Sequence, residues 1–357
     1  MLIEQKDLFT GLFVFVKPAI TTFLLMPVKL LFPVITIIIQ SLFSAHASAR
    51  NVLSGKIICL DPGHGGTAAN DSFRQGPTGE REEWINLRVA LLLKEKLEKK
   101  GASVFITRTD DSNIPFDDRI KLALENKAAI FLSIHHNGTA DRSVNFPIIY
   151  FHGNASENKA SVALGKAVAR QLQKALYGGK TPVSLVSDHT IFSTAGTKVL
   201  RGTYGIPGII AEASFFTHPE EERRLKSRQH NEKEAQAFVK ALEEFFSARH
   251  PPILEKNSQV QIAPFTAFQE AERMNPVALQ WRADFEEGKK LLQKGDSAAL
   301  TQAFDLFTRS AKSFPDSYVA AQCHLYRAAI LQKLGKTAEA SQEELRVKER
   351  YVLIDSQ

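Results

Sequence analysis

Histidines that follow two apolar runs are the residues whose types and spacing point most directly to chemistry in this chain. His64 comes after the apolar run 56–60, and the pair His135 and His136 comes after the apolar run 129–134. Glycines flank His64 on both sides, and its loop has neither of the glycine spacings that cradle a phosphate. Histidines at the ends of buried strands are well placed as metal ligands.

A cluster of carboxylates lies between the two histidine sites. Glu80, Glu82 and Glu83 open an amphipathic stretch that predicts a helix over 83–100. Two histidines and one carboxylate from three such ends can converge on one metal ion. That set leaves a fourth position for water, which is the open arrangement of catalytic zinc.

The residues alone leave open which carboxylate and which histidine of the pair would bind the metal. Any of the three carboxylates could supply the ligand, and so could either histidine of the pair at 135–136. In an alternating strand these two rings point to opposite sides, so one is expected to reach the metal and the other to shape a substrate groove or face solvent. His189 and His218 are expected in surface loops, away from the metal.

The elements that must position these groups alternate between strands and helices. This alternation predicts an α/β domain at 52–249 with a mostly parallel sheet and helices on both faces. Residues 177–197, rich in Gly, Ser and Thr, are long enough for a loop over the groove. Strands are expected over 56–60, 103–107, 129–134, 146–151 and 208–211, and helices over 83–100, 118–126, 158–176 and 220–248.

Five ordered pieces of the sequence resemble one family, the zinc-dependent N-acetylmuramoyl-L-alanine amidases of the bacterial cell wall. The resemblance covers about residues 56–246. The run after Glu212 departs from the family pattern, and this departure concerns substrate fit more than chemistry. The pieces are 58–66, 82–87, 107–111, 133–137 and 211–215, which read ICLDPGHGG, EEWINL, TRTDD, SIHHN and AEASF, followed by PEE at 219–221.

The resemblance implies a site and a reaction. It selects His64, Glu82 and His135 as zinc ligands and Glu212 as the catalytic carboxylate, and it places Arg201 where a side chain could bind a substrate carboxylate. The implied reaction is hydrolysis of the amide bond between N-acetylmuramic acid and L-alanine in peptidoglycan. Glu212 would take a proton from the metal-bound water and return it to the departing amine. The alternatives are another zinc peptidase or deacylase of wall fragments and a non-catalytic envelope adaptor.

The first 47 residues predict export. The stretch 8–43 is almost entirely apolar, with Lys29 before the apolar run 30–43 and a small-x-small site at 45–47. This pattern is typical of a signal peptide or, if uncleaved, of an N-terminal anchor, so the rest of the chain is expected in the periplasm or cell envelope. The formal net charge of +6 comes without a basic stripe or reader motif, so no nucleic-acid partner is expected.

The C-terminal part predicts a linker and a helical region. Residues 250–276 are polar and lack a clear hydrophobic period, so they are interpreted as a linker. From 277 to 357 the period is helical, and the offsets from Ala303 to Phe307 and Pro315 are similar to those of a tetratricopeptide repeat. Such helices could hold a protein activator or an envelope partner. Cys59 and Cys323 are expected as core residues rather than as a disulfide.

Overall fold

The computed structural model describes residues 51–66, 74–273 and 275–354. The predicted export segment therefore lies outside the described residues. From Asn51 onward the chain forms one compact unit. None of the helices in the described ranges is both long enough and apolar enough to cross a membrane.

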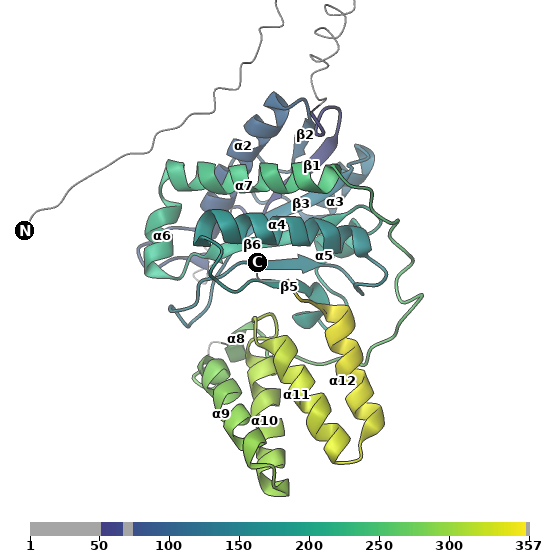
Figure 1. Ribbon diagram of the computed structural model, residues 1–357. Helices are drawn as coiled ribbons and strands as arrows, with labels where there is room; N and C mark the ends of the chain where they lie inside the picture. The colour runs from purple at the N-terminus through teal and green to yellow at the C-terminus, as the bar shows by residue number, and fades with distance from the viewer. Residues whose placement is uncertain (1–50, 67–73, 274, 355–357) are drawn as a thin grey trace, which may run out of the picture. The chain divides into compact units, whose positions relative to one another are not determined.

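A seven-stranded sheet lies at the centre of this unit, in the order β2-β1-β3-β6-β4-β5-β7 (Figure 1). Four neighbouring pairs of strands are parallel, whereas β4 runs antiparallel to β6 and β7 antiparallel to β5. The prediction of a mostly parallel sheet is confirmed. The strands are β1 (Ile57–Pro62), β2 (Ser103–Ile106), β3 (Ile130–Asn137), β4 (Ile148–Phe151), β5 (Ser184–Ser187), β6 (Gly208–Phe215) and β7 (Tyr351–Val352).

Helices cover both faces of the sheet because successive strand residues alternate between two hydrophobic cores. Leu132 and Ile149 pack into one core with the helices α2 (Glu82–Lys99), α4 (Lys159–Tyr177) and α7 (Arg228–Phe246). Their neighbours Phe131 and Tyr150 pack into the other core. That second face carries α3 (Phe116–Glu125), α5 (Lys198–Gly202) and the C-terminal helices. The prediction of helices on both faces is confirmed.

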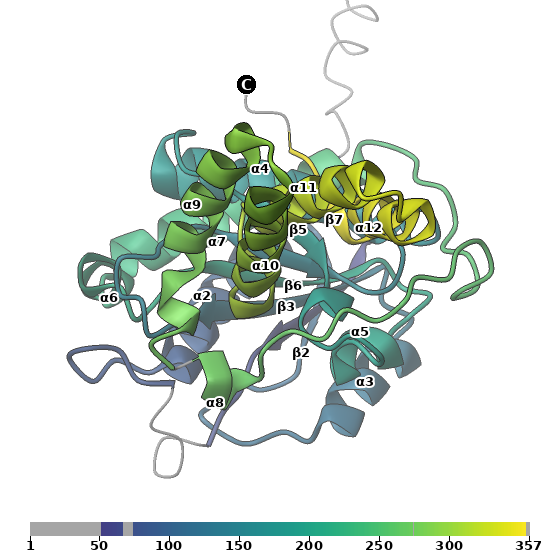
Figure 2. The same ribbon diagram turned by 90° about the horizontal axis from the view of Figure 1, so that it is seen from below.

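The C-terminal helices share a hydrophobic core with the seven-stranded sheet. Figure 2 looks onto these helices, which lie over the sheet. Phe314 contacts the sheet-side rings of Phe146 and Phe215, and Tyr150 of β4 donates to the buried carboxylate of Asp316. The helices are α8 (Glu270–Arg273), α9 (Trp281–Lys294), α10 (Ser297–Ser313), α11 (Ala320–Lys333) and α12 (Thr337–Arg350), and α12 leads into β7 at the edge of the sheet.

Two details differ from the expected elements. The expected loop at 177–197 contains the buried strand β5, which pairs with β4; the loop prediction was wrong there, because only two apolar residues mark this short strand. The expected helix at 220–248 is two helices, α6 (Pro219–Leu225) and α7. Short 3-10 turns, η3 (Asp188–Thr190) and η4 (Ala278–Gln280), complete the described elements. Cys59 and Cys323 are both buried in the core.

Candidate metal centre

The loop that carries His64 is held in a strained conformation at the carboxyl end of β1. The φ angle of His64 is +59°, a region that residues other than glycine rarely adopt. Before it, the buried carboxylate of Asp61 accepts hydrogen bonds from Thr107, Arg119 and Ser133, each at 2.7 Å. Burial alone would raise the pKa of Asp61, but Arg119 and the two hydroxyls hold it below its usual value. A charged, fully hydrogen-bonded carboxylate therefore anchors the loop.

Two buried arginines fix this loop from the other side. Arg119 donates to the carbonyl oxygen of His64 at 2.7 Å. Arg108 donates to the carbonyl oxygens of Gly63 at 2.8 Å and Glu83 at 2.7 Å, so one guanidinium joins the loop to the first turn of α2. A guanidinium has five N–H donors, so a single arginine can donate hydrogen bonds to several buried carbonyl oxygens at once.

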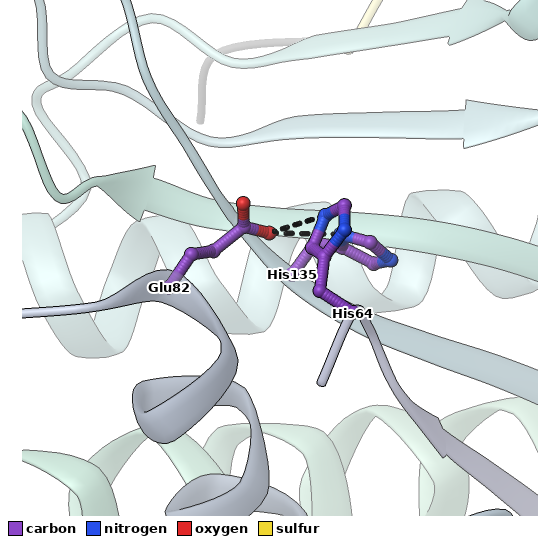
Figure 3. Close-up of side chains that lie close together, drawn as sticks. All are labelled: His64, Glu82 and His135. Carbon is purple, nitrogen blue, oxygen red and sulfur yellow. Dashed lines mark hydrogen bonds and ion pairs between the residues drawn. The ribbon is translucent and has the colours of Figure 1, made fainter. Parts of the chain in front are cut away.

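His64, Glu82 and His135 come together at this point, from the loop after β1, the start of α2 and the strand β3 (Figure 3). The Oε1 atom of Glu82 lies 3.2 Å from Nε2 of His64 and 2.9 Å from Nδ1 of His135. Gly63 makes room for this packing, because a Cβ atom there would lie 2.1 Å from the ring of His135. These are the three residues that the resemblance selects as metal ligands.

The protonation states of this cluster suit a bound cation. Burial alone would raise the pKa of Glu82, but the two imidazoles hold it well below its ordinary value. Burial lowers the pKa of His64 despite the attraction of Glu82. A charged carboxylate and a neutral imidazole are the forms in which these side chains ligate metals.

A buried network orients Glu82 from behind. The amide of Asn86 donates to Oε1 of Glu82 at 3.2 Å, and its Oδ1 lies 2.9 Å from Nδ1 of His136. The other ring nitrogen of His136 lies 3.2 Å from Oε2 of Glu234 on α7. His136 is fully buried. The expectation that it shapes a groove or faces solvent was wrong, because this carboxylate-bearing helix covers it.

Glu212 lies on β6 directly opposite His135 on the neighbouring strand β3. The two side chains therefore point to the same face of the sheet, from strands whose backbones are about 4.8 Å apart. Burial, and then the nearby charge of Glu82, raise the pKa of Glu212 well above its ordinary value, against the opposing charge of His136. Its Oε2 atom is buried and accepts no hydrogen bond from the part of the chain that the structure describes. Glu212 is thus a carboxyl group prepared to hold a proton.

The side chain of Arg74 also contacts the cluster. Its Nε donates to Nε2 of His64 at 3.2 Å and lies 3.7 Å from Oε2 of Glu82. A histidine nitrogen whose lone pair coordinates a metal cannot also accept a hydrogen bond. Metal binding through Nε2 of His64 therefore requires that the Arg74 guanidinium move away from it.

The neighbouring carboxylates have other partners. Glu80 pairs with Arg88 at 2.7 Å, and Glu83 pairs with the buried Arg81 at 2.8 Å. Of the three acidic residues that opened the amphipathic stretch, Glu82 is the one that the structure brings to the two histidines.

The structure places Arg201 and His218 in other surroundings. Arg201 is exposed and donates to the carbonyl oxygens of Ala195 at 2.8 Å and Gly196 at 3.2 Å, in the loop that precedes α5. His218 accepts a hydrogen bond from the backbone N–H of Glu221 and so caps α6. Neither belongs to the cluster around Glu82.

A second group of potential ligands joins His152, Asp188 and His189. Nδ1 of His152 lies 2.9 Å from the buried Asp188 carboxylate, whereas Nζ of Lys256 lies 3.2 Å from its Nε2. Burial, and then the charge of Arg350, lower the pKa of His189 to about 4. Two cationic side chains thus surround this group, which disfavours a metal cation. The group instead fastens the segment around residue 256 to the sheet.

Comparison with known proteins identifies the class. The model of the N-acetylmuramoyl-L-alanine amidase family (Amidase_3) matches residues 58–244, more than half of the chain. The chain belongs to this family, as the resemblance predicted. The matched region contains the cluster of His64, Glu82 and His135 together with Glu212.

Individual relatives are similar over the same region. A probable cell wall amidase, LytH, of Staphylococcus epidermidis is 29% identical over 200 residues, which are 56% of this chain and 62% of that protein. LytH of Staphylococcus aureus is 29% identical over 209 residues, 56% of this chain and 61% of that protein. The chain thus spans about three fifths of the length of these curated relatives. The N-acetylmuramoyl-L-alanine amidase AmiC2 of Nostoc punctiforme is 24% identical over 55% of this chain and 99% of that chain, with a TM-score of 0.46.

Proposed function

We propose that this chain is a zinc-dependent amidase that cleaves the bond between N-acetylmuramic acid and L-alanine in peptidoglycan. The observation that carries the proposal is the convergence of two histidines and a carboxylate on one point, with a buried carboxyl group on the adjacent strand. Membership of the family supplies the reaction class and the substrate.

The spacing of the donor atoms fits a zinc ion held by His64, Glu82 and His135. Ligand atoms about 2.0–2.1 Å from a tetrahedral zinc ion lie roughly 3.3 Å from one another. The distances of 3.2 and 2.9 Å from Glu82 to the two rings are close to that spacing. When bound, zinc would polarise the substrate carbonyl and lower the pKa of a coordinated water molecule.

Glu212 is the proposed proton carrier. A carboxyl group with a raised pKa can accept a proton at neutral pH and release it again to a departing amine. The unpartnered Oε2 of Glu212 supports this role, because an acceptor of this kind is available to a water molecule or to substrate. Asn86 and His136 would act as positioning residues that hold Glu82 in the orientation of a ligand.

The location and partners follow from the same proposal. The staphylococcal relatives are described as cell wall amidases, and the apolar stretch 8–43 favours export. We therefore place the enzyme in the cell envelope, where peptidoglycan is its substrate. The C-terminal helices, with their tetratricopeptide-like spacing, are proposed to hold an envelope partner; Leu325 and Leu334 of this region are large apolar residues that stay exposed.

Mass spectrometry of a peptidoglycan digest tests the reaction. The purified chain with zinc should release stem peptides that begin with L-alanine and leave glycan strands intact. The variant Glu212→Gln keeps the shape of the side chain but cannot carry the proton, so it should bind zinc and release no peptide. Peptides cut internally would indicate a different zinc peptidase, and unchanged release by Glu212→Gln would contradict the role of Glu212.

A further inference from the structure

An exposed tryptophan lies beside the loop of the metal centre. Trp84 is the third residue of α2, two positions after Glu82, and 38% of it is exposed. Its indole Nε1 donates to Oδ2 of Asp111 at 3.0 Å. A tryptophan with a bonded N–H and an exposed ring presents a flat apolar surface in a fixed orientation.

Asp111 ties this ring to the loop of His64. Its second oxygen, Oδ1, accepts from the backbone N–H of Gly66 at 2.9 Å, two residues after His64. Gly65 packs directly on the loop between β2 and α3, which contains Asp111, because a Cβ atom at Gly65 would lie 2.1 Å from the carbonyl oxygen of Ser112. Trp84 and the metal-centre loop are therefore held together through one carboxylate.

Arg108 strengthens the same arrangement. Its buried guanidinium donates to the carbonyl oxygen of Glu83, the residue before Trp84, at 2.7 Å, and to that of Asp110, the residue before Asp111, at 2.9 Å. One rigid group thus fixes both partners of the hydrogen bond between indole and carboxylate. Such second-layer support is what a preorganised binding surface requires.

The surroundings of Trp84 select a class of ligand. The stretch 109–118 contains four aspartates and no Lys or Arg. Lys198 pairs with one of them, Asp117, at 2.8 Å, whereas Asp110 and Asp111 are exposed near Trp84. Negative charge here repels polyanions and peptides that carry free carboxylates. An uncharged sugar suits this surface, because its hydroxyls donate to carboxylates and the C–H face of a pyranose ring packs on an indole.

We propose that Trp84 is a saccharide-stacking residue and that Asp111 is its positioning residue. Together they hold a sugar ring of the glycan strand next to the metal centre, on the side of the sheet where β1 and β2 lie. This inference rests on the proposed function for the identity of the polymer. It adds the direction in which the substrate lies, with the glycan over Trp84 and the stem peptide on the side of Glu212 and β6.

Tryptophan fluorescence and calorimetry test the proposal with chitotetraose, an uncharged tetrasaccharide of N-acetylglucosamine that carries no peptide to hydrolyse. The chain has two tryptophans, and the other, Trp281, is 3% exposed and packs on Phe314. A change in emission would therefore report Trp84. In the metal-free chain we expect saturable quenching or a blue shift, and an affinity that falls about fivefold or more in Trp84→Ala, the scale of one aromatic contact.

Matched variants separate the role of this ring from a general effect. Phe192→Ala removes a similarly exposed aromatic residue in the loop after β5, near the opposite edge of the sheet, and should bind the tetrasaccharide as the unaltered chain does. Asp111→Ala removes both hydrogen bonds and should weaken binding, whereas Asp111→Asn keeps an acceptor for the indole and should retain most of the affinity.

Three results would overturn the proposal. These are no saturable signal with the tetrasaccharide, equal affinity in Trp84→Ala and the unaltered chain, or the same fluorescence change with a tripeptide that carries free carboxylates. Saccharide binding without any hydrolysis of peptidoglycan would remove the proposed function and leave this site. Hydrolysis of peptidoglycan by a chain that fails the binding test would support the proposed function and remove the saccharide site.

Discussion

Gly63→Ala should weaken zinc binding although it replaces none of the proposed ligands. The new Cβ atom would lie 2.1 Å from Cε1 and Nε2 of His135, whereas ordinary contacts begin at 3.4 Å, so the ring must retreat by about 1.3 Å. Ligand distances at metal sites tolerate deviations of about 0.2 Å. We therefore expect the affinity for zinc to fall roughly 10- to 100-fold, the range for disturbed ligand orientation, and the free energy of unfolding to fall by about 1–3 kcal/mol from overpacking.

Competition with a chelator measures the affinity, and urea unfolding of the metal-free protein measures the stability. Gly208→Ala is the matched control, because its Cβ atom would have no neighbour closer than 3.5 Å. In the double variant Gly63→Ala, His135→Ala the clash is absent, so the stability lost in Gly63→Ala should return. If Gly63→Ala binds zinc as tightly as the unaltered chain, the packing of Gly63 against His135 does not set the metal geometry, and the reasoning fails.

Three further predictions concern acid stability, the C-terminal helices and the cation beside the metal centre. Burial alone would raise the pKa of Glu343, but His324 and Arg327 lower it to about 2; its stabilisation, about 3 kcal/mol at neutral pH, is therefore present above pH 4.5 and lost as the pH falls toward 2. Urea unfolding should show a smaller loss over that range in Glu343→Gln, and identical pH profiles would contradict this. Deletion of 277–357 should expose the second core and give a chain that binds a hydrophobic dye and lacks a cooperative thermal transition, whereas a folded truncation would refute the shared core. Arg74→Ala should raise the affinity for zinc about threefold to tenfold, because it removes a positive charge 3.2 Å from a ligand atom; reduced affinity would mean that Arg74 supports the metal instead.

The meeting of two histidines and a carboxylate was predictable from the residues because parallel strands end at one edge of a sheet, whereas the choice of Glu82 and His135 among their neighbours came from the family resemblance. Each histidine follows an apolar run, and the carboxylate opens the helix between them. The position of Glu212 was predictable from the resemblance, and the register of β6 against β3 gives its physical meaning. The metal roles of these residues stay predictions until an ion is measured.

Other features depend on contacts between distant parts of the chain that no local pattern encodes. The partner of His136 is Glu234, 98 residues away, so its burial was not visible in the alternation of one strand. Arg108 and Arg119 resemble ordinary surface arginines in the sequence, yet both are buried against backbone carbonyls. Likewise, the apolar face of the C-terminal helices gave no sign that Phe314 packs on Phe146 in the core on one face of the sheet.

The zinc content of the purified chain tests the central claim most directly, measured beside Glu82→Gln and the neighbouring control Glu80→Gln. The account predicts one zinc ion per chain in the unaltered protein and in Glu80→Gln, and a loss of zinc in Glu82→Gln, because Glu82 alone of these carboxylates faces both histidines. Full retention of zinc by Glu82→Gln, or a chain that binds no zinc at all, would contradict it.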